Sequence, residues 1–366
     1  MKNRKTERRT VMSEVKKALI AMSGGVDSSV AALLMQKYGY DCAGATMLLH
    51  KSADDSQTCG AMSEVESARS VSDSLGMPFH VFDCSDLFET SVIERFVCAY
   101  EAGRTPNPCI DCNRYLKFDE FFNRAMKLGF DCMATGHYAR IEFSPESGRY
   151  LLKKAVDPSK DQSYVLWSLR QEQLSHTVFP LGGFTKAEAR QIAADRNLST
   201  AHKADSQDIC FVPDGKYAAF VERFRNKIYP AGDFVTTDGK VLGQHKGIIR
   251  YTVGQKKGLG LVLPEPLYVQ SIKPEANQVV LGRSEELFSR ELIAHDINLI
   301  SLPAIKGEYR LKAKVRYRHT EEWATVTQPD SDTLCVVFDE PQRAITKGQS
   351  VVLYDGDTVV GGGVIA

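Results

Sequence analysis

The sequence predicts an α/β fold with a parallel sheet, followed by a small mixed central domain and a C-terminal β-barrel. From Ala18 to about Gly136, short apolar runs alternate with helical stretches, which is typical of parallel strands joined by covering helices. After Phe211 the chain becomes rich in glycine, valine and alternating residues, with turn signals such as Asp238-Gly239 and Asp355-Gly356. A chain of 366 residues is also too long for one ordinary core, so we expect two or three domains.

Apolar runs of strand length and glycine stops define the elements of the first domain. A glycine follows three of the helical stretches, at Gly39, Gly76 and Gly129, because a helix C-terminus favours a residue that adopts positive φ. In chain order we expect a strand Ala18–Met22, a helix Ser28–Tyr38, a strand Cys42–Met47, a helix Glu64–Leu75, a strand Phe79–Asp83, a helix Phe118–Leu128, a strand Cys132–Thr135 and a helix Lys186–Arg196.

Changes in composition predict the domain boundaries. The first residues are basic, but they include Glu7 and Glu14 and lack the apolar face of a transit peptide, so we expect a disordered tail. Met12 stands just before the first strand, and residues 1–11 are expected to contribute nothing to the fold. We predict a tail over 1–15, a catalytic domain over 16–212, a central domain over 213–280 and a barrel over 281–366.

Composition indicates a cytoplasmic protein with reduced thiols. No run approaches the roughly 18 apolar residues that a membrane span requires. The nine cysteines are scattered and odd in number, which favours thiols in the cytosol over a disulfide framework. Because the formal net charge is zero, a nucleic acid would have to be held by local basic patches.

A phosphate-binding loop follows the first predicted strand. Ser23-Gly24-Gly25-Val26-Asp27-Ser28-Ser29 leads straight into a helix, and its two glycines let backbone amides turn inward beside the positive end of that helix. The GxxxxGK[ST] spacing of a Walker loop is absent, which argues against a kinase or motor ATPase. In this context SGGVDSS resembles the pyrophosphate (PP) loop of the N-type ATP pyrophosphatases. The resemblance implies ATP, Mg²⁺ and an adenylated intermediate, and a turn without a ligand is the alternative.

Three cysteines stand in unusual local sequence. Cys109 and Cys112 lie in Gly103–Asn113, where two prolines predict a stiff loop, and Cys210 lies far downstream in DSQDICF. A sulfurtransferase needs one thiolate to accept sulfur as a persulfide, and a second thiolate helps to release it.

Seven ordered segments extend the resemblance over nearly the whole chain. SGGVDSS, TPNPCIDCNRYLKF, ATGHYAR, KDQSYVLW, DSQDICF, GQKKGLG and RYRH together resemble the bacterial tRNA-specific 2-thiouridylases. That resemblance implies an ATP-dependent tRNA-uridine 2-sulfurtransferase, which adenylates O2 of the wobble uridine and forms 2-thiouridine with sulfur from a cysteine persulfide. It also implies two partners: tRNAs of the Lys, Glu and Gln type, and a sulfur donor such as a cysteine desulfurase or a sulfur-relay protein.

The resemblance implies a role for each matching residue. Cys112 resembles the nucleophile and Cys210 the persulfide carrier, and the two would form a disulfide when sulfur is released. The implied ATP-binding positions are Ala21, Met22, Ser23, Gly24, Gly25, Val26, Asp27, Ser28, Met47 and Gly136. The implied positions for the target base and the rest of the tRNA are Asn107, Pro108, Cys109, His137, Lys160, Asp161, Gln162, Arg316, Tyr317 and Gln349.

One position departs from the family pattern and leaves alternatives open. Many members have an aspartate in place of Cys109, and Asp111 is then a candidate general acid or base. Alternatively, Cys109, Cys112 and Cys210 would hold a [4Fe-4S] cluster, as in related tRNA thiolases. A zinc site is disfavoured because a second CxxC or a spaced His pair is lacking. An amide-forming PP-loop synthetase would need the loop but not the cysteines.

A basic segment near the C-terminus predicts an RNA-binding strand. From Arg310 to Arg318 basic residues alternate with apolar and aromatic ones, so a strand would put five cations on one face. An anionic partner would relieve their repulsion, whereas acidic neighbours would make this an ordinary solvated face. Tyr251 or Tyr317 would either stack on an unpaired base or pack against the protein.

Overall fold

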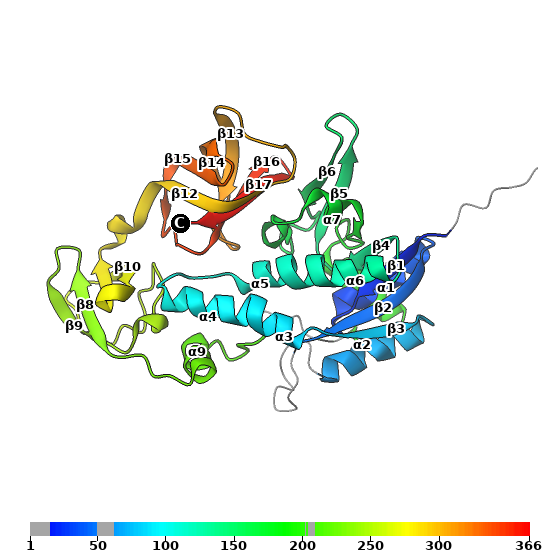
Figure 1. Cartoon of the computed structure of the whole chain (residues 1–366), viewed down its shortest axis with the longest axis horizontal. Coiled ribbons are helices and arrows are strands. Elements are labelled where there is room, and N and C mark those ends of the chain that lie inside the picture. Colours follow the sequence, from blue (N-terminus) through cyan, green and yellow to red (C-terminus); the bar gives the residue numbers. More distant parts are fainter. Residues whose placement is uncertain (1–14, 50–61, 202, 204–208) are drawn as a thin grey trace, which may run out of the picture.

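The computed structural model describes residues 15–49, 62–201, 203 and 209–366. The tail expected over 1–15 lies outside these ranges apart from Val15, and so does the DSQDICF segment before Ile209. The described residues form a parallel sheet with its helices, a four-stranded sheet and a barrel (Figure 1). Within these ranges no helix has both the length and the apolar character to cross a membrane.

The parallel sheet places a crevice at its centre. Its strand order is β3 (Phe79–Asp83), β2 (Asp41–Leu48), β1 (Lys17–Ala21), β4 (Cys132–Thr135) and β7 (Thr177–Val178). All of these pairings are parallel. The chain moves outward from β1 to β3 and then returns to place β4 on the other side of β1. Open α/β sheets bind ligands at the carboxyl ends of strands where the order reverses in this way.

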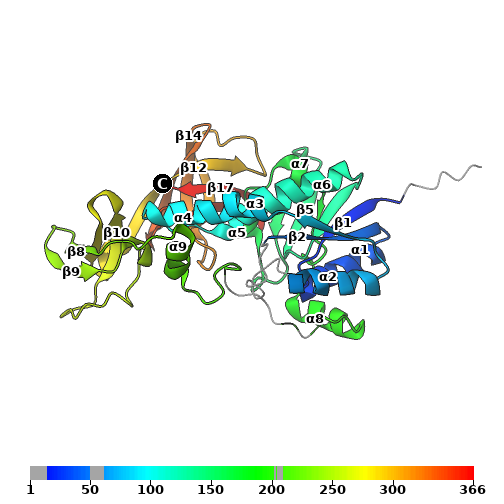
Figure 2. The same cartoon turned by 60° about the horizontal axis from the view of Figure 1, so that its bottom comes forward.

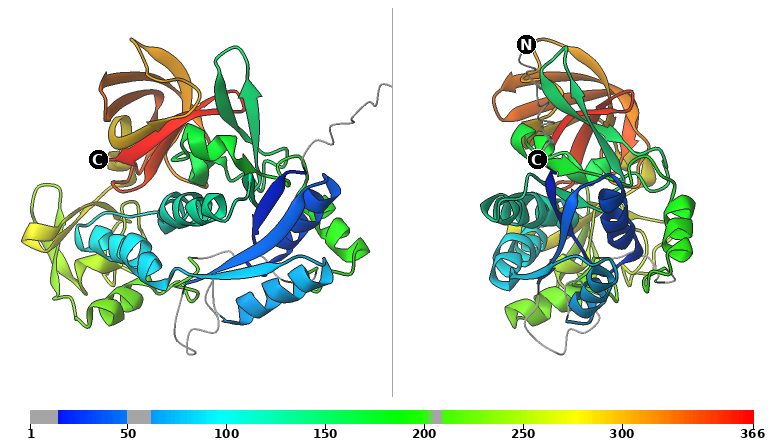
Figure 3. Two further views of the ribbon diagram at one scale, coloured as in Figure 1. Left: turned by 45° about the vertical axis from the view of Figure 1, so that its right-hand side comes forward. Right: turned by 90° about the vertical axis from the view of Figure 1, so that its right-hand side faces the viewer.

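Both faces of this sheet are covered by helices, as Figure 3 shows. Leu19 of β1 packs in the cluster that contains Phe121, whereas Ala18 and Ile20 pack with Met35 on the opposite face. This alternation reflects the two-residue period of a strand. The helices involved are α1 (Val26–Lys37), α2 (Met62–Ser74) and α6 (Phe121–Lys127), and α8 (Lys186–Asp195) packs on α1. The predicted parallel α/β fold is confirmed.

Two long helices reach from the sheet toward the other units (Figures 1 and 2). The first joins α3 (Ser85–Phe88) and α4 (Glu94–Glu101) through the π-helical segment Glu89–Ile93. The second joins α5 (Pro108–Asp111) and α6 through the π-helical segment η3 (Cys112–Glu120).

The second long helix corrects two predictions. The helix expected at Phe118–Leu128 begins at Pro108, and Cys109 and Cys112 lie in its first turns instead of in a loop. The reason is local, because Asn107 accepts a hydrogen bond from Cys109 N at 3.2 Å and Pro108 occupies the first helical position, where it is tolerated.

A small central unit follows the first domain. Its sheet has the order β10 (Tyr268–Lys273), β11 (Gln278–Gly282), β8 (Gly232–Thr236) and β9 (Val241–His245), and only the β11–β8 pairing is parallel. Helix α9 (Tyr217–Arg225) joins this unit to α4 through Arg225, which pairs with Glu94 at 2.7 Å and Glu101 at 3.1 Å.

The C-terminal strands close into the predicted barrel. Their order is β12 (Phe288–Leu299), β15 (Thr333–Arg343), β14 (Glu322–Asp330), β13 (Tyr309–Lys314), β16 (Ser350–Asp355) and β17 (Thr358–Ile365), and β12 pairs with β17. The hairpin β5 (Ala139–Ser144) and β6 (Arg149–Lys154) of the first domain adds to β17. The remaining elements are short: η4 (Ser163–Leu166), α7 (Gln171–Ser175), η5 (Ile248–Arg250), η6 (Pro274–Ala276) and η7 (Ser284–Leu287).

The basic strand is shorter than predicted. Strand β13 ends at Lys314 and the chain then turns, with His319 N donating to Arg316 O at 3.1 Å. The prediction of five cations on one strand face is therefore wrong, because Arg316 and Arg318 lie beyond the end of the strand. Arg310 pairs with Asp339 at 2.6 Å, so the outer part of the strand is a solvated face with an acidic neighbour.

Candidate active site

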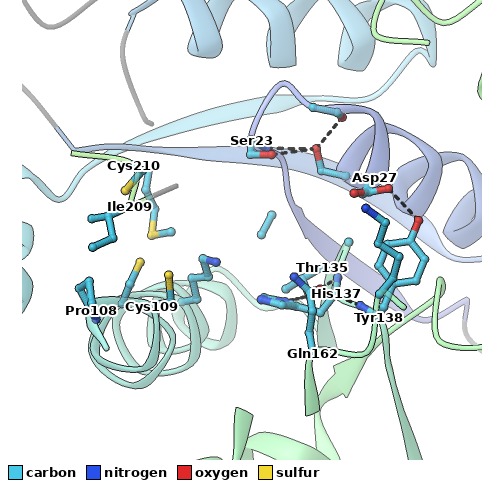
Figure 4. A pocket seen from close by; sticks show the side chains of 18 of the residues that line it. Ser23, Asp27, Pro108, Cys109, Thr135, His137, Tyr138, Gln162, Ile209 and Cys210 are labelled. Carbon is cyan, nitrogen blue, oxygen red and sulfur yellow. Dashed lines mark hydrogen bonds between the residues drawn. The ribbon is translucent and has the colours of Figure 1, made fainter. Parts of the chain in front are cut away.

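A cavity of about 960 Å³ opens at the carboxyl ends of β1 and β4. Its walls come from the PP loop, the second long helix, the loop after β6, Ile209–Phe211 and the turn after β13. Figure 4 shows Cys109 and Cys210 at the left, Ser23 and Asp27 along the top and right, and His137 with Gln162 below them. The barrel thus contributes part of the wall of a site that is centred on the first domain.

Hydroxyl groups of the PP loop form hydrogen bonds within the loop and fix its conformation beside the cavity. Ser28 Oγ donates to Gly25 O at 3.1 Å and accepts from Ser23 N at 3.2 Å. Ser29 Oγ also donates to Gly25 O, at 2.9 Å. Helix α1 starts at Val26, so its first amides lie at the cavity, where they offer an anion site.

Two glycines allow the backbone around the loop to pack closely. Gly24 has φ +70°, and a Cβ there would lie 2.7 Å from Glu64 O. A Cβ on Gly136 would lie 2.8 Å from both Asp27 C and Ser28 N. Gly136 therefore lets the end of β4 touch the PP loop.

Asp27 binds two side chains that the sequence prediction missed. Its carboxylate accepts from Lys186 Nζ at 2.7 and 2.8 Å and from Tyr138 Oη at 2.8 Å. The sequence interpretation placed Lys186 only at a helix start and Tyr138 only in a motif, so their contact with the loop depends on packing of α8 beside α1.

The three singled-out cysteines line the same cavity. Cys112 begins η3, Cys109 is exposed one turn earlier, and Cys210 approaches with Ile209 from a distant part of the chain (Figure 4). In the described ranges, however, no three His, Cys, Asp or Glu side chains are grouped to hold a metal ion. This arrangement does not fit the [4Fe-4S] alternative, and we derive no step through a cluster.

Asp111, the candidate acid or base, does not line the cavity. Its carboxylate lies 3.5 Å from Arg95 Nε. Burial raises the pKa of the Asp111 carboxyl above its usual value, although Arg95 acts in the opposite direction. Because the Asp111 side chain lies beside Arg95 and outside the cavity lining, it has no direct access to a nucleobase in the cavity.

His137 forms a neutral aromatic part of the wall. It is buried, its Nδ1 lies 2.6 Å from Thr135 Oγ1, and its ring lies 5.6 Å from that of Phe118. Burial, and secondly the charge of Lys117, lowers the pKa of His137 well below its ordinary value. A neutral imidazole here can donate or accept a hydrogen bond but supplies no charge.

Two further residues with implied tRNA contacts, Asp161 and Gln162, form side-chain hydrogen bonds with other groups of the protein. Asp161 accepts from Ala155 N at 2.9 Å and from Ser163 Oγ at 2.8 Å. Gln162 Oε1 accepts from Tyr138 N at 2.9 Å. Both line the cavity, so they shape the loop that also presents Lys160.

The cavity gathers most of the implied residues but not all of them. Asn107, Arg316 and Gln349 do not line it, and neither does Gly24. Gln349 Nε2 donates to Thr105 O at 2.8 Å and so connects the barrel to the segment before the cysteines. The implied residues that do line it are Ala21, Met22, Ser23, Gly25, Val26, Asp27, Ser28, Met47, Pro108, Cys109, Cys112, Gly136, His137, Lys160, Asp161, Gln162, Cys210 and Tyr317.

Several cations around the cavity were not assigned to it from sequence. They are Lys117, Lys203, Lys314 and Arg318. Lys314 Nζ lies 5.8 Å from the ring centres of both Tyr164 and Tyr317, and burial lowers the pKa of Lys314. The alternating basic pattern identified Lys314 as a surface cation, but only the fold shows that it faces the cavity.

Fold and cavity together define a PP-loop α/β protein with cysteines opposite its nucleotide loop. Three family models match in succession: the tRNA methyl transferase HUP domain over residues 16–214, the tRNA methyl transferase PRC-barrel domain over 218–283 and the aminomethyltransferase beta-barrel domain over 289–365. The tRNA-specific 2-thiouridylase MnmA of Clostridioides difficile (strain 630) is 49% identical over 353 residues, which cover 96% of this chain and 98% of that protein. The MnmA of Acetivibrio thermocellus is 49% identical over 355 residues, covering 96% of this chain and 99% of that protein. The chain belongs to the family of tRNA-specific 2-thiouridylases.

Proposed function

We propose that this protein is a tRNA-uridine 2-sulfurtransferase that uses ATP to replace O2 of the wobble uridine with sulfur. The observation that carries the proposal is one cavity with a PP loop at one side and Cys112 and Cys210 at another. The names of the matching HUP and PRC-barrel models refer to methyl transfer, but those of the relatives refer to 2-thiolation, and the facing cysteines favour the latter.

The first half-reaction activates the base. Uridine O2 attacks the α-phosphorus of ATP, a P–O bond to the β-phosphate breaks, and pyrophosphate leaves toward the amides at the start of α1. The loop fits this role because its glycines and hydroxyls leave those amides at the cavity. Mg²⁺ would accompany the phosphates of ATP and neutralise part of their charge, whereas the Asp27 carboxylate beside them is held by Lys186 and Tyr138.

The second half-reaction transfers sulfur. The terminal sulfur of a Cys210 persulfide bonds to C2, and the C2–O2 bond breaks as AMP leaves. The Cys112 thiolate attacks Cys210 Sγ, which breaks the persulfide bond and leaves a Cys112–Cys210 disulfide and a thiocarbonyl. A thiol reductant then restores both cysteines, and a sulfur donor such as a cysteine desulfurase or sulfur-relay protein reloads Cys210.

The tRNA partner is proposed to approach the mouth formed by the first domain and the barrel. Lys160, Tyr317 and Arg318 line the cavity there, and an anionic backbone would be attracted to the two cations. The target uridine would leave its stack to reach the cysteines. We place this reaction in the cytosol, on tRNAs of the Lys, Glu and Gln type.

Transfer of radiolabelled sulfur into unmodified tRNA tests the function. Cys112→Ser and Cys210→Ser should each lower ATP-dependent transfer by about 10²-fold or more, because each removes a reacting sulfur. Cys335→Ser is the matched control, since Cys335 lies on β15 of the barrel and does not line the cavity. Unimpaired transfer in Cys210→Ser would overturn the persulfide role. An inactive Cys109→Ser, with iron in anaerobically purified wild type, would instead support the cluster mechanism.

A further inference from the structure

The helix that carries Cys112 changes its winding where it lines the cavity. Its segment η3, Cys112–Glu120, is π-helical, and such segments frequently occur at functional sites. In an α-helix, residue 117 would point roughly 140° away from residue 112. A π-helix hydrogen-bonds residues five apart and brings them onto the same side. Cys112 and Lys117 accordingly both line the cavity.

Lys117 lines the same cavity as the cysteines and the nucleotide loop. Helical Cα–Cβ bonds tilt toward the N-terminus, so Lys117 leans toward the end of the helix that carries Cys112. Its charge is also felt by His137, which stands one residue beyond Gly136 and so close to the PP loop. A long side chain from this position extends into the cavity that the cysteines and the PP loop also line.

Acidic residues on the same helix do not neutralise this lysine. Asp119 pairs with Arg170 at 3.0 Å, and Glu120 pairs with Arg124 at 2.6 Å. Across the described part of the chain, Lys117 itself has no ion pair with a carboxylate. A half-buried lysine that lines a cavity without an acidic partner favours an anionic ligand.

We propose that Lys117 binds the phosphate of the adenylated uridine and stabilises AMP as the leaving group. The proposal rests on the function proposed above. As the C–S bond forms and the C2–O2 bond breaks, the electron pair of the broken bond moves to an oxygen of AMP. Lys117 compensates this charge from the cysteine side, while the pyrophosphate of the earlier step departs on the side of the PP loop. Lys117 therefore acts on the second half-reaction and not on ATP capture.

Single-turnover kinetics on the full-length protein separate the two half-reactions. The enzyme is loaded with persulfide by a cysteine desulfurase and cysteine, then mixed with ATP and an unmodified Lys-type tRNA. Pyrophosphate release reports adenylation, and 2-thiouridine formation reports sulfur transfer. In Lys117→Met we expect pyrophosphate release close to wild type and 2-thiouridine formation slowed by about 10²- to 10³-fold. Adenylated tRNA should accumulate, and Lys117→Arg should recover much of the rate.

Lys127→Met is the matched control, because Lys127 is an exposed lysine on the same helix outside the cavity. It should behave as wild type in both measurements. The proposal is overturned if Lys117→Met leaves 2-thiouridine formation unchanged, or if it slows both steps equally, which would indicate a role in binding or folding. Absence of tRNA-dependent pyrophosphate release in wild type would instead contradict the proposed function itself.

Discussion

Gly136 lies where the end of β4 meets the PP loop, with no room for a side chain. A Cβ would lie 2.8 Å from two backbone atoms of the loop, which cannot move aside as the end of a flexible side chain could. His137, the next residue, is buried and neutral for a related reason, since the wall around it is packed with rings. At this scale, the site depends on close packing as much as on reactive groups.

Gly136→Ala should displace the PP loop and abolish most of the tRNA-dependent release of pyrophosphate. Overpacking of this kind also costs about 1–3 kcal/mol in the free energy of unfolding, which denaturant titration measures. Gly183→Ala is the control, because a Cβ there meets nothing within 4 Å. Normal pyrophosphate release by Gly136→Ala would show that the loop tolerates the displacement.

The second long helix determines how the cysteines are presented. Asn107 caps it, Pro108 begins it, and the π-helical segment η3 then turns Lys117 toward the side of Cys112. In the sequence, the two prolines of this segment predict a stiff loop, and the capping role of Asn107 is not part of that prediction. The cap and the first turn are local structure, whereas the π-helical segment that follows packs Leu116 and Phe118 in the core.

Asn107→Ala should loosen the first turn of this helix. Loss of the acceptor for Cys109 N costs about 1 kcal/mol, as for other N-cap residues. Hydrogen exchange measured by mass spectrometry should become faster for a peptide that contains Cys109 and Ile110, with little change in α6. Asn107→Asp keeps the acceptor oxygen and should exchange as wild type does. Equal exchange in wild type and Asn107→Ala would mean that tertiary packing alone holds the turn.

The first domain and the barrel are joined by buried polar contacts. Trp167 Nε1 donates to Ser350 Oγ at 3.1 Å, and Tyr164 Oη donates to Ser350 O at 2.8 Å. Both aromatic side chains are fully buried. Together with the pairing of β6 to β17, these contacts make the barrel a fixed wall of the cavity. We therefore expect the two units to unfold together.

Ser350→Ala should lower the stability of both units. It leaves the buried indole N–H of Trp167 without its acceptor, which costs about 1–3 kcal/mol. Hydrogen exchange should accelerate in β1 and β4 as well as in β16, and calorimetry should show one shifted transition for the pair. Ser331→Ala, in an exposed turn of the barrel, is the control. Faster exchange confined to the barrel would show that the units unfold separately.

The sequence by itself determined the parallel α/β fold, the barrel, the PP loop and the identity of the three cysteines. Strands β3 and β4 occur at the predicted residues, and the loop follows β1, because these features depend on neighbours in the chain. Only the tertiary structure decided that Lys186 reaches Asp27, that the β5–β6 hairpin joins the barrel and that Lys117 and Lys314 face one cavity. Those relations join segments far apart in the chain. They arise from packing of apolar faces and closure of sheets, which local periodicity does not encode.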